Sequence, residues 1–76
     1  MAEFVYLQTG ERPPPDKEWL LIIKTHNRDY ELIVSRRTEA ITLGTDTTLQ
    51  DAQTRATAAS KSLRIETIYV LGVPNA

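Results

Sequence analysis

The sequence predicts a small α+β domain with one helix packed on one face of an antiparallel sheet of about four or five strands. Residues 19–23 are five consecutive apolar residues, which place hydrophobic surface on both faces of a strand. Residues 47–64 instead repeat apolar residues at helical spacing. The remaining segments are short and β-prone, so the expected order is four strands, a helix and a final strand.

Length and composition limit what this domain can be. A chain of 76 residues forms one domain at most, residues 1–76, and it contains no cysteine that could strengthen a small core. We therefore expect either a very compact fold or stabilisation by association. A chain without cysteine, without a signal-peptide pattern and without a membrane-spanning apolar stretch fits the cytoplasm. The nine Lys/Arg and ten Asp/Glu residues leave a net charge near zero. Such a low charge removes one barrier to self-association and gives little attraction to the phosphates of a nucleic acid.

The N-terminal part divides into a strand and a linker. Residues 1–8 contain aromatic and β-branched side chains without helical periodicity, which predicts a possible N-terminal strand. Residues 9–16 include three consecutive prolines, which hold the backbone extended and remove hydrogen-bond donors. This segment is interpreted as a Pro-rich linker that precedes the core, residues 17–72.

The core begins with a hairpin. Residues 17–26 and 29–36 are predicted strands, and Asn27 and Asp29 favour a tight turn between them. Residues 39–44 are predicted to add a short third strand.

The predicted helix starts at Thr47, where Gln50 completes a capping-box pattern. Asp51 suits the positive end of the helix dipole and is placed to pair with Arg55 one turn later. The helix is expected to end near residues 62–64. Its narrow apolar stripe, rich in alanine for close packing on a sheet, consists of Leu49, Ala52, Ala56, Ala59 and Leu63. Residues 65–71 form the final predicted strand, closed by Gly72 and Pro74.

The two faces of the sheet receive different predicted side chains. The helix is expected to cover Trp19, Leu21, Ile23, Leu32 and Val34. The opposite face would expose Leu20, Ile22, Ile33, Tyr69 and Leu71. If contiguous, that patch would reach the size of the largest apolar patches usual on monomers. A shift of one residue in strand register would exchange the two sets.

Three occupants could cover this helix-free face: the N-terminal segment, a second copy of the chain, or a different protein. Coverage of both faces within the chain is a further alternative. An edge strand also offers pairing with a strand of a partner, and the N-terminal segment could pair with a neighbouring copy.

The sequence shows no pattern that predicts catalysis. His26 is the single histidine, and it lies in the predicted hairpin turn. The serines have no triad-like surroundings, and three dispersed glycines make no phosphate-binding loop. We therefore expect neither catalytic residues, nor a cofactor, nor a metal.

The function that the sequence favours is a non-enzymatic protein–protein interaction module, most simply a homo-oligomer formed through the helix-free face or the N-terminal strand. Its expected interface residues are Leu20, Ile22, Ile33, Tyr69 and Leu71, with Lys24 and Arg37 as a polar rim. One alternative is a weak nucleic-acid-binding domain using Lys24, Arg28, Arg36 and Arg37. Another is a small inhibitor or adaptor that docks on a larger protein. The arrangement of elements is common in small bacterial and phage domains, which indicates architecture and carries no functional residues.

Overall fold

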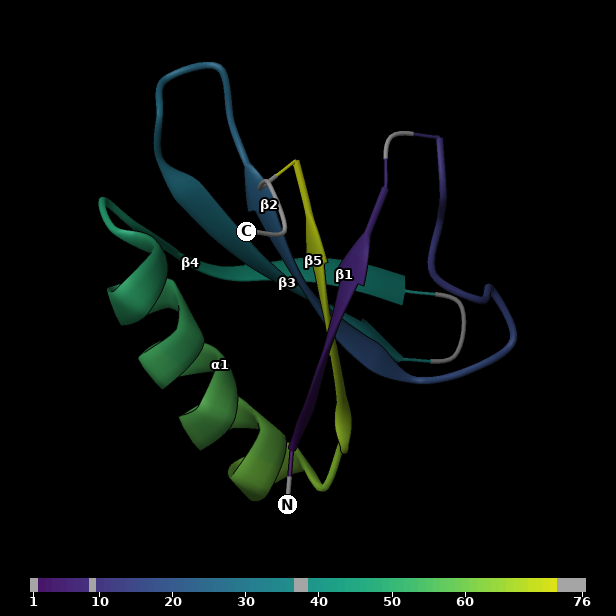
Figure 1. The fold of residues 1–76 in the computed structure, drawn as a ribbon. Helices are drawn as coiled ribbons and strands as arrows, with labels where there is room; N and C mark the ends of the chain where they lie inside the picture. Colours follow the sequence, from purple (N-terminus) through teal and green to yellow (C-terminus); the bar gives the residue numbers. More distant parts are fainter. Residues whose placement is uncertain (1, 9, 37–38, 73–76) are drawn as a thin grey trace.

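A computed structural model describes residues 2–8, 10–36 and 39–72 of the chain. Its elements are β1 (Glu3–Leu7), β2 (Trp19–Lys24), β3 (Tyr30–Arg36), β4 (Glu39–Asp46), α1 (Leu49–Leu63) and β5 (Thr67–Leu71). The strands form one five-stranded sheet in the order β1-β5-β2-β3-β4, and α1 packs on one of its faces (Figure 1). The small α+β class and the order of elements along the chain are confirmed.

The sheet is mixed, whereas the sequence predicted an antiparallel one. β2, β3 and β4 pair antiparallel, but β5 lies between β1 and β2 and is parallel to both. The difference has a topological cause. α1 carries the chain across the face of the sheet from β4 at one edge to β5, and crossover connections of this kind join parallel strands.

The proline-rich segment is the second crossover. It leads from β1 to β2, in the opposite direction across the sheet from α1, between strands that run the same way. Crossovers between parallel strands are almost always right-handed, so the two connections belong on opposite faces. Figure 1 shows α1 and the segment before β2 on opposite sides. The Trp19 indole N–H donates to the Pro14 carbonyl oxygen at 2.7 Å, so the segment lies against the face without the helix.

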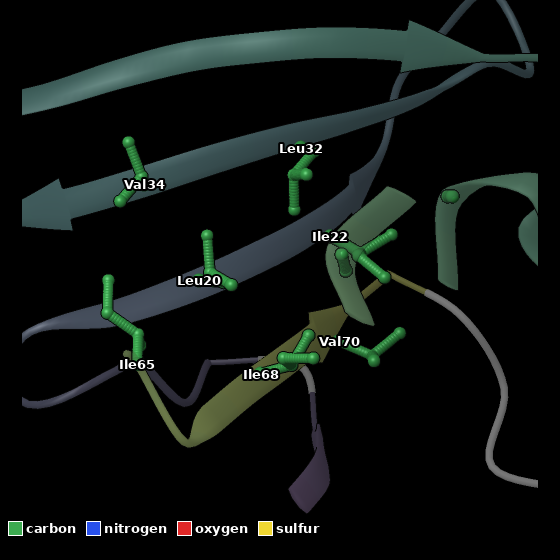
Figure 2. Close-up of a cluster of buried hydrophobic side chains, with 9 residues drawn as sticks. Leu20, Ile22, Leu32, Val34, Ile65, Ile68 and Val70 are labelled. Atoms are coloured by element: carbon green, nitrogen blue, oxygen red, sulfur yellow. The ribbon is translucent and has the colours of Figure 1, made fainter. Parts of the chain in front are cut away.

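The core lies between α1 and the sheet. Its buried members are Leu20, Ile22, Leu32, Val34, Ala52, Ala56, Ile65, Ile68 and Val70 (Figure 2). The strand registers align the six core residues of the strands, together with the partly buried Phe4 and Tyr6, in two rows across the sheet: Phe4, Ile68, Leu20 and Val34 in one, and Tyr6, Val70, Ile22 and Leu32 in the other. Ala52 and Ala56 are fully buried, which confirms the alanine-rich stripe as the packing surface of α1.

The predicted assignment of the two faces of β2 is wrong. Leu20 and Ile22 lie under the helix with zero exposure, and Trp19, Leu21 and Ile23 point to the other face. The turn explains the error. The Thr25 N–H donates to the Asp29 carbonyl oxygen at 2.8 Å, so the loop contains three residues, whereas the predicted faces require a loop with an even number of residues. A loop with an odd number of residues shifts the strand register by one residue, and this shift exchanges the two faces of β2 relative to β3.

The helix α1 begins one residue later than the sequence predicted. Thr48, and not Thr47, is the N-cap, and its side-chain oxygen accepts the Asp51 N–H at 3.1 Å. The end is confirmed: α1 stops at Leu63, and Arg64 adopts a left-handed conformation that closes the last turn onto the Ser60 carbonyl oxygen. Within the described residues, no helix combines the length and apolar character that a membrane crossing requires.

Candidate interaction surfaces

In the part of the chain that the structure describes, β4 lies at one edge of the sheet and carries the most exposed large apolar side chains. Among residues 2–8, 10–36 and 39–72, the exposed large apolar residues are Ile41 (54%) and Leu43 (41%). Both belong to β4, which pairs with β3 on one side and lies at the end of the described sheet. α1 begins at Leu49, directly after β4, and then crosses away towards β5 (Figure 1). The helix therefore leaves most of β4 uncovered.

A β-bulge interrupts the pairing of β4 with β3. Leu32 pairs with Gly44 and Ile33 with Thr42, so Leu43 has no direct partner on β3. Bulges of this kind increase local twist, and they are one device by which proteins keep sheet edges from open-ended pairing. Between Glu39 and Asp46 the strand contains no charged residue and no proline, which are two other devices that protect sheet edges.

An ion pair anchors the Asp46 end of β4 to α1. Arg55 Nε lies 2.8 Å from Asp46 Oδ2, and Arg55 Nη2 lies 3.0 Å from Oδ1. The hydrogen bond from Arg55 and its positive charge hold the pKa of Asp46 below its usual value, although partial burial works in the other direction. The same hydrogen bond raises the pKa of Arg55. The predicted pair between Asp51 and Arg55 is thus replaced by a pair between helix and strand.

Gly44 makes room for this ion pair. A Cβ atom at Gly44 would lie 3.0–3.1 Å from three atoms of the Arg55 guanidinium group. The guanidinium therefore crosses the strand directly over this glycine. The arrangement holds the first half of α1 against the Asp46 end of β4.

The helix-free face forms a second apolar cluster. Val5, Tyr69, Leu21 and Ile33 are aligned across four strands, with Leu7, Leu71 and Ile23 in the next row. The Trp19 and Tyr69 rings meet edge to face, with centroids 6.3 Å apart. Leu21 is buried with 7% exposure, and the other members are half-buried. The apolar run at residues 19–23 implies that something must cover the helix-free face, and the proline-rich segment covers part of it.

The expected interface residues divide between the two faces. Leu20 and Ile22 are core residues with zero exposure, so they cannot contact a partner while the domain is folded. Ile33, Tyr69 and Leu71 lie on the helix-free face, as expected. Lys24 is exposed at the end of β2. Arg37 lies outside the described residues.

The three cationic residues of the nucleic-acid alternative that the structure describes, Lys24, Arg28 and Arg36, do not gather into one patch. Arg28 lies at the hairpin tip with a positive φ of 65°, and Lys24 lies at the same end of the sheet. Arg36 lies at the other end of β3, where its Nε is 3.4 Å from Glu18 Oε2. A seven-residue strand spans about 20 Å, so Arg28 and Arg36 cannot contact one short stretch of backbone phosphates together.

Sequence reasoning missed Ile41 and Leu43 as surface candidates, because nothing local marks a strand as an edge. The available signal was indirect: β4 precedes a helix long enough to carry the chain across the sheet. Within the part of the chain that the structure describes, no group of three or more His, Cys, Asp or Glu side chains could hold a metal ion.

A scan against protein-family models, a search of curated proteins and a search of solved structures found no match to this chain.

Proposed function

We propose that this chain is a non-enzymatic protein–protein interaction module that self-associates by pairing β4 with β4 of a second copy. The observation that carries this proposal is the outer edge of β4, where no strand of the described residues pairs and where the side chains of Ile41 and Leu43 are exposed. Strand addition satisfies main-chain donors and acceptors without a sequence motif. The helix-free face, in part covered by the proline-rich segment, is less suited to this role.

A second copy suits this edge because a strand paired antiparallel with itself obeys two-fold symmetry. In the register centred on Thr42, Ile41 of each copy lies opposite Leu43 of the other, and Glu39 lies opposite Thr45. In this register the apolar side chains of the two copies contact each other. The acidic residues at the strand ends, Glu39 and Asp46, do not lie opposite an acidic residue of the other copy. The formal net charge of −1 adds little repulsion between copies. Pairing at β4 consumes that edge in both copies, so the assembly closes at two.

Sedimentation velocity from low to high micromolar concentration tests the proposal. We expect a dimer that the substitution Ile41→Lys dissociates, with an unchanged circular dichroism spectrum, because Ile41 is exposed. The matched control is Thr54→Lys, which adds the same charge at an exposed position of α1. A monomer at every concentration, or an Ile41→Lys variant that remains dimeric, would refute pairing at β4.

Crosslinking tests the register. The chain contains no cysteine, so Thr42→Cys introduces a single thiol at the proposed two-fold axis. Directly opposed residues of antiparallel strands have Cα atoms about 4.5–5.5 Å apart, within the range that a disulfide needs. Oxidation should give a covalent dimer from Thr42→Cys and much less from Thr54→Cys.

We further place the module in the cytoplasm, the compartment that a chain without cysteine fits, and cell fractionation tests that location.

A further inference from the structure

The opposite edge of the sheet borders a groove, and this groove has the features of a peptide site. We propose that an extended peptide binds there as a strand antiparallel to β1, with its C-terminal carboxylate beside Lys61 and Arg64. This inference concerns β1 and α1, so it stands apart from the proposed self-association through β4.

The backbone of β1 offers the hydrogen bonds that an added strand needs. The Glu3 N–H donates to the Glu66 carbonyl oxygen at 2.7 Å, which begins the parallel ladder with β5. Alternate residues of a strand direct their backbone groups to opposite sides. Glu3, Val5 and Leu7 therefore bond to β5, and Phe4 and Tyr6 present their N–H and C=O groups to the outer edge. An incoming strand would meet those four groups.

The groove runs along α1 beside this edge. It consists of two hollows of about 530 and 560 Å³ that share Thr57 and Lys61 in their linings. Each hollow lies within the size range of small-ligand sites. Ala2 and Phe4 contribute the β1 side, and polar residues of α1 contribute the opposite wall. The Gln53 amide donates to the Tyr6 hydroxyl at 3.1 Å, which ties that wall to the strand.

The charges that line the groove indicate which way the peptide runs and which of its ends lies beside Ala2. Lys61 and Arg64 line the hollow next to Ala2, together with the single carboxylate of Glu66, so positive charge is in excess there. Neither cation forms an ion pair with another residue in the described ranges. An antiparallel strand ends where β1 begins, which is at this hollow. Its C-terminal carboxylate would therefore lie near two cationic side chains, an arrangement that favours charge-assisted hydrogen bonds.

The first experiment is a selection on the intact chain with a display library of random seven-residue C-terminal peptides. Enriched peptides are then synthesised with a fluorescein label, and binding is measured by fluorescence anisotropy. We expect replacement of the free carboxylate by an amide to weaken binding by roughly 10- to 150-fold, the factor that corresponds to a lost charge-assisted bond of about 1.5–3 kcal/mol. The double variant Lys61→Gln, Arg64→Gln should lose a similar factor for the free acid and much less for the amide.

Two matched variants separate the groove from the rest of the surface. Thr57→Trp fills the space between the two hollows and should abolish binding, whereas Ser62→Trp places the same ring at an exposed position outside the groove lining. Circular dichroism of both variants confirms that they are folded. Ile41→Lys, which changes the β4 edge, should leave peptide binding unchanged, so failure of self-association and failure of the peptide site are distinguishable.

Hydrogen exchange provides a readout that does not depend on any substitution. In the free chain, the amides of Phe4 and Tyr6 should exchange faster than those of Val5 and Leu7, and a bound peptide should protect Phe4 and Tyr6 selectively. The proposal is overturned if the library yields no enriched peptide, if Thr57→Trp binds as well as Ser62→Trp, or if amidation has no effect.

Discussion

The register of β2 against β3 makes Ile22 a core residue and leaves its neighbour Ile23 on the helix-free face, and this difference can be measured. Ile22 has zero exposure and packs beneath α1, whereas Ile23 is half-buried. Truncation of either residue to alanine removes the same three carbon atoms. At about 0.8 kcal/mol per buried CH₂, full burial assigns roughly 2.4 kcal/mol to Ile22 before any cavity is counted.

The cavity left under the helix adds to that cost. Large-to-small substitutions of this kind in protein cores cost about 2–5 kcal/mol, so we expect about 3–4 kcal/mol for Ile22→Ala. A domain of this size has a free energy of unfolding of roughly 4–11 kcal/mol, so the substitution removes a large part of it. The melting temperature should fall by about 12–32 °C, at 4–8 °C per kcal/mol for small domains. Ile23→Ala should cost about 1 kcal/mol, because Ile23 is incompletely buried.

Urea unfolding followed by circular dichroism gives both free energies, and an unchanged m-value shows that only stability has changed. The measurements are made at low protein concentration, so that any dimer does not contribute. If Ile23→Ala costs as much as Ile22→Ala or more, the assignment of faces described above is wrong and the register is the one that the sequence predicted.

Two further predictions concern the turn and the ion pair. Arg28→Gly should raise the free energy of unfolding by about 0.5–1 kcal/mol in urea titrations, because a positive φ of 65° strains any residue with a Cβ; a loss of stability would mean that the Arg28 side chain makes a contact that outweighs the strain. Asp46 has a pKa lowered from 3.8 in the folded state, so its pair with Arg55 contributes stability above that pH, and the contribution is lost as pH falls through the lowered pKa. Asp46→Asn should therefore be less stable than the parent chain at pH 7 and close to it at the lowest pH, and an equal difference at both pH values would contradict this account.

The sequence predicted the class of fold, the order of its elements and the apolar stripe of α1, because each depends on local periodicity and capping. It placed Leu20 and Ile22 on the wrong face because the residues around Asn27 do not distinguish a three-residue loop from a loop with an even number of residues. One residue in that loop decides the partners of the whole strand.

Parallel pairing was missed for a different reason. The position of β5 between β1 and β2 depends on where α1 delivers the chain, and no residue within β5 encodes its neighbours. The same limit applies to the candidate surfaces. Ile41 has an ordinary strand pattern around it, and its exposure follows from the place of β4 in the sheet.

The place of β5 has a consequence for how the chain acquires its fold during synthesis. β1 is made first, yet its partner in the described sheet is β5, and Val5 pairs with Tyr69 near the other end of the sequence. The hairpin of β2 and β3 can form locally as soon as it leaves the ribosome. In contrast, β1 can pair with β5 only after β5 has also emerged. Contacts this distant in sequence slow folding, and unpaired strands that wait are prone to misassembly. A ribosome stalled before Thr67 should therefore hold β1 in an unpaired state that proteases can cleave.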